Sequence, residues 1–285
     1  MKCQFYISDF EKVYWMKKVS IVIPVYQNED NIHSTVTELL LLKNRLKNYD
    51  LQLIFVDDGS TDRSYELLVK YHKKYPSMIK LVKLTKNFGQ TLAVREGIRT
   101  ADGHCIGIVS ADLQDPPELF LDMIKHWENG VKLVIAERQQ REEGLIHSYF
   151  SNLYWRFVNR YAIKDFPVGG FDFCLFDRQI KLSLDPIAER NTAIFPLIFW
   201  LGYDYAIIRY KRRLRKAGKS QWTLIKRIQL TINTVISFTY LPVRFISAMG
   251  ISLSLFSLLY TSFLTLRWFF YGSSVEGWTS LAILI

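Results

Sequence analysis

The amino-acid sequence predicts an α/β protein built on a mostly parallel, doubly wound sheet, followed by an amphipathic juxtamembrane helix and a transmembrane helical hairpin. Two observations carry this prediction. From Val19 onward, short apolar runs alternate with segments of helical period, which is typical of a parallel sheet with helices on both faces. Near the C-terminus, the uncharged run Phe245–Leu266 would span about 33 Å as a helix, enough to cross a bilayer.

The predicted elements follow one another in a regular order. Each strand is a short apolar run, each helix repeats apolar residues every three or four positions, and Ser60–Asp62 offers a cap for the second helix. In chain order, the elements are a strand at Val19–Pro24, a helix over 32–46, a strand at Leu51–Val56, a helix carrying Leu67, Leu68 and Tyr71, a strand at Ile79–Leu84, a helix from Gln90 to Ile98, a strand at His104–Val109, a helix carrying Leu119, Met123 and Trp127, and a strand at Lys132–Ala136.

The most informative segment is Val109–Glu118, which follows the fourth predicted strand. A carboxylate at the C-terminal end of a strand lies where an open α/β sheet places its ligand. Asp115 fits the N-cap of the next helix, with Pro116 as its first residue and Glu118 as the reciprocal partner. The ligand role therefore falls on Asp112 and Gln114, whose oxygens suit a divalent cation, Mg²⁺ or Mn²⁺, that bridges to a diphosphate.

The ends of the earlier strands carry groups that could read a nucleotide. Tyr26 follows the first strand, where an aromatic ring can stack on a base, and Asp57 and Asp58 end the second, where carboxylates can accept from an imino N–H. Because the carboxyl ends of parallel strands meet at one edge, base, ribose and diphosphate could be bound in a row. In the less regular part 137–204, a double glycine precedes Asp172 and predicts a constrained loop there.

The chain carries a formal net charge of +10, much of it close to the predicted membrane segment. The aromatic and motif context of a nucleic-acid reader is missing, so we expect no nucleic-acid partner. A basic segment before a membrane helix instead places that side in the cytoplasm, against an anionic leaflet. The odd number of cysteines predicts neither a disulfide framework nor a zinc site, and hence a reduced compartment. The basic residues are Lys211, Arg212, Arg213, Arg215, Lys216 and Lys219.

Four segments are expected along the chain. Residues 1–18 lack the apolar core of a signal peptide and form either a disordered leader or a mis-assigned start. Residues 19–210 form the α/β domain, and 211–242 combine the basic segment with an amphipathic interfacial helix over Trp222–Leu241. Residues 243–285 form the membrane hairpin, whose second arm is truncated. A buried core helix is the alternative for the first arm, but its length and its bracketing arginines favour the membrane.

Five ordered motifs resemble those of the family 2 glycosyltransferases with a GT-A fold. Within that family, they are most similar to the dolichyl-phosphate mannose synthase and bacterial polyprenyl-phosphate glycosyltransferase branch. The resemblance covers nearly the whole chain from Val19 to the membrane segment, and the ordered set is more specific than any one motif. The motifs are Ile21–Tyr26, Val56–Asp62, Asn87–Gln90, Ala111–Glu118 and Arg215–Trp222.

The resemblance implies a role for each matching position. Asp112 and Gln114 match metal and diphosphate contacts, and Arg138 matches an arginine that neutralises the donor phosphates. Asp172 matches a carboxylate near the sugar and acceptor, which makes Asp112 and Asp172 the candidate catalytic residues. The remaining nucleotide-sugar contacts are Pro24, Tyr26, Asn28 and Asp57, and the lipid-phosphate contacts are Arg213, Arg215 and Ser220.

The implied reaction is transfer of a hexose from a nucleotide sugar, UDP-linked by resemblance, to a polyprenyl phosphate such as undecaprenyl phosphate, with inversion. The implied protein is a multi-pass cell-membrane enzyme with a cytoplasmic catalytic domain, and a homotetramer. Two alternatives stay open. A processive polysaccharide synthase would carry a Gln-x-x-Arg-Trp element that this sequence lacks. A non-catalytic membrane scaffold that binds nucleotide sugars is the other.

Three positions depart from the family pattern. Ser110 stands where the family usually has the first aspartate of Asp-Ala-Asp, and Gln27-Asn28 replaces the usual Asn-Glu. Cys174 occupies a position that often holds arginine. Fewer carboxylates weaken divalent-cation binding, because the number of charged ligands tunes affinity in oxygen-ligand sites. The sequence therefore predicts the fold more firmly than it predicts a need for metal.

Overall fold

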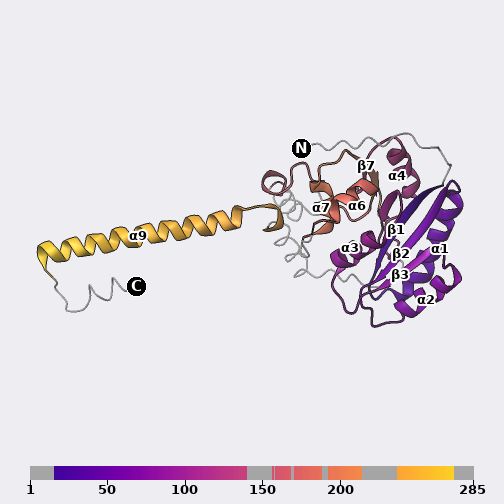
Figure 1. Cartoon of the computed structure of the whole chain (residues 1–285), viewed down its shortest axis with the longest axis horizontal. Helices are drawn as coiled ribbons and strands as arrows, with labels where there is room; N and C mark the ends of the chain where they lie inside the picture. The colour runs from indigo at the N-terminus through magenta and orange to yellow at the C-terminus, as the bar shows by residue number, and fades with distance from the viewer. Residues whose placement is uncertain are drawn as a thin grey trace. The chain divides into compact units, whose positions relative to one another are not determined.

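The computed structural model describes residues 16–139, 156, 158–167, 170–187, 192–213 and 236–272. Two compact units divide the chain, Met1–Thr234 and Val235–Ile285. The first unit holds the sheet and its helices, and the second holds one long helix (Figure 1). The predicted leader lies almost entirely outside the described residues, as do most of the predicted interfacial helix and the second arm of the hairpin.

The first unit is an α/β structure around a seven-stranded sheet in the order β3-β2-β1-β4-β6-β5-β7. Six of the strands run in one direction, and β6 is antiparallel to both of its neighbours. The predicted mostly parallel sheet is therefore confirmed, with one reversed strand inserted in it. The strands are β1 (Lys17–Val25), β2 (Tyr49–Asp57), β3 (Ile79–Lys83), β4 (Cys105–Ile108), β5 (Leu133–Arg138), β6 (Cys174–Asp177) and β7 (Tyr205–Tyr210).

Helices cover both faces of the sheet, as the alternating pattern predicts. Successive strand residues point to opposite faces, and one face of β1, with Ile21 and Ile23, joins a core cluster with Val36 of α1 and Phe120 of α4. The other face of β1 meets α3, which Figure 1 shows on the opposite side of the sheet from α1. The helices of this unit are α1 (Glu29–Arg45), α2 (Ser64–Lys74), α3 (Gln90–Thr100), α4 (Leu119–Glu128), α6 (Arg178–Leu184) and α7 (Ile194–Trp200).

Close approach between layers depends on two glycines. A Cβ on Gly97 of α3 would lie 2.3 Å from Val22 Cγ1 in β1. A Cβ on Gly107 of β4 would lie 2.3 Å from the ring of Phe120 in α4. Interiors are packed too tightly to absorb such an overlap without moving their neighbours. These glycines therefore set how closely α3 and α4 pack on the two faces of the sheet.

The start of α4 corrects one prediction. Asp115 does not cap this helix, because α4 begins at Leu119, its N-cap residue is Glu118, and no side chain bonds its first amides. An N-cap side chain accepts from the backbone N–H two or three residues on, and Pro117 has no N–H to donate. The Asp115 carboxylate points into the first unit instead.

The second unit contains α9 (Leu241–Tyr271), a helix of 31 residues whose apolar side chains are exposed. Its segment Val243–Tyr271 is long and apolar enough to cross a membrane, with a mean hydropathy of 1.6. Among the described residues, this is the one helix with that property. The structure therefore supports one candidate span where the sequence predicts a hairpin, whose second arm falls outside the described residues.

Candidate active site

The predicted nucleotide-sugar residues, all within the described part of the chain, gather at one edge of the sheet. Strand β1 pairs in parallel with β2 and β4, so their carboxyl ends lie together. At the far side, Arg138 at the end of β5 pairs with Tyr210 at the end of β7. Because β6 is antiparallel, its first residue Cys174 pairs with Ile108 at the same edge, which brings the loop containing Asp172 there. A parallel edge supplemented by one reversed strand thus collects residues from across the chain.

The loop after β1 is held by side chains of the next loop. Pro24 lies near the end of β1, and in the loop Gln27 has a positive φ of 50°, which few residues other than glycine adopt. The backbone N–H of Gln27 donates to Ser60 Oγ at 3.1 Å, and that of Asn28 donates to Ser64 Oγ at 2.9 Å. These bonds tie the predicted base-binding loop, with Tyr26 at its start, to the segment after β2.

Asp57 and Asp58 are adjacent buried carboxylates with different surroundings. Asp58 accepts hydrogen bonds from the backbone N–H groups of Phe88 and Gly89, at 2.7 and 2.8 Å. Asp57 accepts from the Ser60 N–H at 3.4 Å, and its Oδ1 has no hydrogen-bond partner. Burial raises the pKa of both carboxyls. Asp58 therefore holds a loop, whereas Asp57 retains a buried carboxylate oxygen whose hydrogen-bonding capacity is unused.

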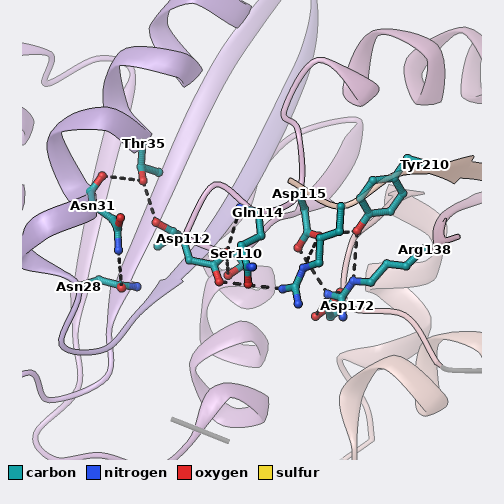
Figure 2. Close-up of polar contacts among 12 residues, drawn as sticks. Asn28, Asn31, Thr35, Ser110, Asp112, Gln114, Asp115, Arg138, Asp172 and Tyr210 are labelled. Carbon is teal, nitrogen blue, oxygen red and sulfur yellow. Dashed lines mark hydrogen bonds and ion pairs between the residues drawn. The ribbon is translucent and has the colours of Figure 1, made fainter. Parts of the chain in front are cut away.

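Asp112 lies at the centre of the edge, in a turn where Leu113 has a positive φ of 55°. Its Oδ1 accepts from the Ser110 hydroxyl at 3.0 Å and from the Gln114 N–H at 3.2 Å. The hydroxyl of Thr35 in α1 donates to the carbonyl of Ala111 at 2.8 Å and fixes the turn from behind (Figure 2). The sequence thus folds into a rigid turn that presents one carboxylate.

A divalent cation fits this turn as a partner shared with a substrate. The described residues contain no group of three or more His, Cys, Asp or Glu side chains that could enclose a metal ion. Asp112 and Gln114 can offer a carboxylate and an amide oxygen, the hard donors that Mg²⁺ and Mn²⁺ prefer. Such a cation would take its other ligands from phosphate and water, the usual arrangement when a protein supplies one or two carboxylates.

Asp115 is the most buried member of an ion-pair network beside Asp112. Its Oδ1 accepts from the hydroxyl of Tyr210 and lies 3.3 Å from Arg212 Nε, and its Oδ2 lies 3.5 Å from Arg138 Nη2. Figure 2 shows Asp115, Tyr210, Arg138 and Asp172 turned toward one another. Arg212 also lies 4.0 Å from Asp112 through its Nη2, so the network reaches the centre of the edge.

Arg138 and Asp172, predicted to act on phosphates and on the sugar, form an ion pair. One guanidinium nitrogen of Arg138 donates to both carboxylate oxygens of Asp172, and Arg138 Nε donates to Tyr210 Oη at 3.3 Å. Burial raises the pKa of Asp172 and outweighs the opposing effect of Arg138. Burial disfavours the charged form of Arg138, but Asp172 and Asp115 overcome this and raise its pKa.

The predicted lipid-phosphate residues are placed in part. The two terminal guanidinium nitrogens of Arg213 donate to carboxylates, Nη1 to Glu38 in α1 and Nη2 to Glu118, each at 2.9 Å. Its backbone N–H donates to the carbonyl of Gln114 at 2.9 Å, which ties the segment after β7 to the central turn. Arg215 and Ser220 lie outside the described residues.

Sequence reasoning missed three members of the site, namely Asp115, Tyr210 and Arg212. Asp115 matched a capping pattern, and the two consecutive prolines after it were the signal against that assignment. Arg212 was one of several basic residues in a charged run, and nothing local distinguishes it from the others. Tyr210 joins the site only because β7 pairs with β5, a pairing between distant segments.

The sheet order and this edge define the GT-A class of α/β proteins, and the sequence match then identifies the family. The profile of glycosyl transferase family 2 matches residues 20–180. The chain belongs to this family, as the motif resemblance implies.

Known relatives agree with this assignment over most of their length. An uncharacterized glycosyltransferase of Bacillus subtilis, YkcC, is 33% identical over 267 residues, which cover 93% of this chain and 82% of that protein. The bactoprenol glucosyl transferase of Shigella phage SfV is 27% identical over 272 residues, 94% of this chain and 87% of that one.

A likeness in fold extends to solved structures. Glucosyl-3-phosphoglycerate synthase from Mycobacterium tuberculosis, in complex with Mn²⁺, uridine diphosphate and glucosyl-3-phosphoglycerate, aligns with a TM-score of 0.51. The alignment covers 77% of each chain at 16% identity. The chain is therefore a glycosyltransferase with a GT-A-like, mostly parallel sheet.

Proposed function

We propose that this protein transfers a hexose from a UDP-linked sugar to a polyprenyl phosphate such as undecaprenyl phosphate, with inversion at the anomeric carbon. The observation that carries the proposal is the meeting of Asp57, Asp112 and Arg138 at one sheet edge of a family 2 glycosyltransferase. Residues 19–210 are the proposed catalytic domain.

The donor is proposed to lie along the edge with its base over the first two strands. Tyr26, Pro24 and Asn28 would line the base and ribose, and the unpartnered Oδ1 of Asp57 would accept the imino N–H of uracil. The mycobacterial synthase with the same fold holds uridine diphosphate together with Mn²⁺. A divalent cation held by Asp112 and Gln114 would neutralise charge on the diphosphate.

The reaction itself needs little proton transfer. A phosphate monoester is already anionic near neutral pH, since its second pKa is about 6, so its oxygen can attack the anomeric carbon directly while the nucleoside diphosphate leaves. Arg138 is proposed to stabilise the departing diphosphate, and Asp172 to orient the acceptor or stabilise positive charge on the sugar ring. Catalysis would then rest on alignment of the reactants and on electrostatic stabilisation.

A lipid acceptor is supported by two independent observations. Helix α9 is apolar enough to lie in a bilayer, which a water-soluble acceptor would not require. Phage proteins 27% identical to this chain are named bactoprenol glucosyl transferases. We propose that the basic segment, with Arg213, Arg215 and Ser220, binds the lipid phosphate at a cytoplasmic membrane surface. A multi-pass topology and a homotetramer belong to the same proposal.

A transfer assay tests the proposal directly. The full chain in detergent or membranes is incubated with each of several labelled UDP-sugars and undecaprenyl phosphate, and the lipid extract is searched for a lipid-linked monosaccharide. A labelled monosaccharide lipid supports the proposal, and the sugar that labels it identifies the donor. Polymer would favour a processive synthase, and nucleotide binding without turnover would favour a scaffold; either result contradicts the proposal.

A variant pair tests the acceptor residues. Arg215→Gln is expected to raise the KM for undecaprenyl phosphate several-fold more than the KM for the nucleotide sugar, because it removes one phosphate contact. Arg99→Gln is the matched control, since Arg99 is an exposed arginine on α3 that pairs with Glu96 and has no assigned role in the site. Equal effects of Arg215→Gln on both KM values would contradict its assignment to the lipid phosphate.

A further inference from the structure

We propose that Asp115 is a positioning residue, which holds Arg138 and Arg212 side by side so that their two guanidinium groups form a single phosphate-binding pair. The inference rests on the proposed function and deepens it, because it assigns the binding of phosphate oxygens to a pair of arginines and their alignment to one buried carboxylate. Neither Asp115 nor Arg212 has a role in the sequence-based assignment of the site.

Burial separates the anchor from the groups that it holds. The side chain of Asp115 is 1% exposed, whereas those of Arg138 and Arg212 are 36% and 34% exposed. The shared carboxylate is therefore inside the protein, while about a third of each arginine side chain is exposed. This is the arrangement expected of a support with two ligand-binding groups on it.

Arg212 retains hydrogen-bonding capacity in this arrangement. It lies 3.3 Å from Asp115 and 4.0 Å from Asp112, yet it makes no hydrogen bond to the described residues, and its buried Nε has no hydrogen-bond partner. A guanidinium has five N–H donors in a fixed fork that matches the oxygens of a phosphate. Ion pairing with Asp115 and Asp112 thus positions Arg212, which leaves its terminal N–H groups for an anion.

Asp115 is itself fixed from the inside of the fold. The hydroxyl of Tyr210 donates to Asp115 Oδ1 and accepts from Arg138 Nε at 3.3 Å. The Tyr210 ring packs edge-on against Phe173, with ring centroids 6.0 Å apart. The pairing of β7 with β5 places Tyr210 opposite Arg138. Strand pairing therefore sets the position of the carboxylate relative to Arg138.

Stability alone is a poor explanation for this cluster. Buried ion pairs lose much of their attraction to desolvation, and well-packed apolar residues of similar size are often as stable or more so. Here three carboxylates, on Asp112, Asp115 and Asp172, face two arginines at a solvent-accessible edge. A polyanionic ligand that can accept from both guanidinium groups gives the arrangement a function.

The test measures anion binding separately from catalysis. Asp115→Asn keeps the shape of the side chain and removes its charge. Binding of inorganic diphosphate and of UDP to the full chain is measured by titration calorimetry, with EDTA and with Mn²⁺. We expect the Kd for both probes to rise roughly tenfold or more in EDTA, the scale of one charge-assisted hydrogen bond. In the transfer assay, the donor KM should rise more than kcat falls.

Asp177→Asn is the matched control. Asp177 also pairs with a cation, Lys132 at 3.4 Å, and with an aromatic donor, Trp127 at 2.7 Å, but it ends β6 at the opposite edge of the sheet. Its variant should bind diphosphate like the wild type. Equal diphosphate affinity for Asp115→Asn and the wild type would overturn the inference, and so would an equal loss in both variants.

A second variant decides the matter if Asp115→Asn does not fold. The side chain of Arg212 is 34% exposed, so Arg212→Gln should fold, and it should weaken diphosphate and UDP binding roughly tenfold in EDTA. Unchanged affinity would again overturn the inference. These binding measurements stand apart from the proposed function: a wild type that binds diphosphate through this pair but glycosylates no lipid would end the proposed acceptor and leave the role of Asp115 supported.

Discussion

The two halves of the sheet hold their polar groups at the shared edge in different ways. On the side of β1 and β2, backbone amides and hydroxyls hold the loops, as with Asp58 against Phe88 and Gly89. On the side of β5 and β7, ion pairs hold the groups, as with Arg138 against Asp172. A neutral base needs a shaped acceptor, whereas a diphosphate needs positive charge, so under the proposed function each half would bind one end of the nucleotide sugar.

The halves also differ in how far apart their partners lie in the sequence. The bonds around Asp58 join residues about 30 positions apart, one strand-helix-strand unit. The bond between Asp115 and Tyr210 joins residues 95 apart. The half next to β1 and β2 is therefore assembled from segments that are close in the sequence. The half next to β5 is completed only when β7 joins the sheet. Asp112 lies between the halves.

The largest expected effect is at this junction. Asp112→Ala should reduce transfer of labelled sugar to undecaprenyl phosphate by about a thousandfold or more, because it removes the one carboxylate at the centre of the edge. Its Oδ1 bonds to Ser110 and Gln114 stay within one short turn, so the fold should persist. The measurement is kcat/KM alongside a thermal unfolding curve.

The control for that variant is Asp122→Ala. Asp122 is an exposed carboxylate on α4, paired with Lys125 at 2.8 Å, and its loss should leave transfer unchanged. Near-normal turnover by a folded Asp112→Ala protein would remove Asp112 from the mechanism. It would also move the centre of the chemistry into the half that contains Arg138.

A smaller effect is expected from Arg138→Lys in the charged half. Lysine keeps the positive charge but cannot donate through a planar fork to two oxygens at once. Transfer should therefore fall by about a hundredfold, most of it in kcat if the lost contact forms as the diphosphate departs. The measurement is a steady-state comparison of kcat and donor KM with the wild type. An unchanged kcat would contradict a role at the leaving group.

The sequence predicts the first half of the site better than the second, for a physical reason. Local composition is enough to predict strands such as Val19–Pro24. Parallel pairing of these strands then fixes where Tyr26 and Asp57 lie. The network of Asp115, Tyr210 and Arg212 depends on the pairing of β5 with β7 and on the reversed β6. No local pattern encodes those pairings. The cap assigned to Asp115 was wrong because a good local motif competed with a nonlocal contact.

The next expected effect concerns stability in the half of the site next to β1 and β2. Asp58→Asn should destabilise the protein by about 1–3 kcal/mol, the range for hydrogen bonds to a buried charged group. Both carboxylate oxygens accept backbone N–H groups, and an asparagine would turn an NH₂ donor toward one of them. Chemical denaturation at neutral pH measures the loss. A variant as stable as the wild type would show that the loop at Phe88 does not depend on this acceptor.

The smallest expected effect distinguishes Asp57 from its neighbour, and it has the opposite sign. Burial raises the pKa of Asp57 above its unfolded value of about 3.9. The folded state then binds more protons than the unfolded state between those two values, so the contribution of Asp57 to stability falls as pH rises through that window. Asp57→Asn removes this penalty and should be as stable as the wild type at neutral pH, or slightly more stable.

The same substitution should weaken UDP binding several-fold, because an amide at this position presents a weaker acceptor than the carboxylate Oδ1, which has no protein partner. Denaturation curves from pH 4 to 7 and UDP titrations at neutral pH measure both effects on one pair of proteins. If Asp57→Asn lost as much stability as Asp58→Asn, Asp57 would be a second loop anchor. The base would then need another acceptor, and the contrast between the two halves of the edge would rest on Arg138 and its partners alone.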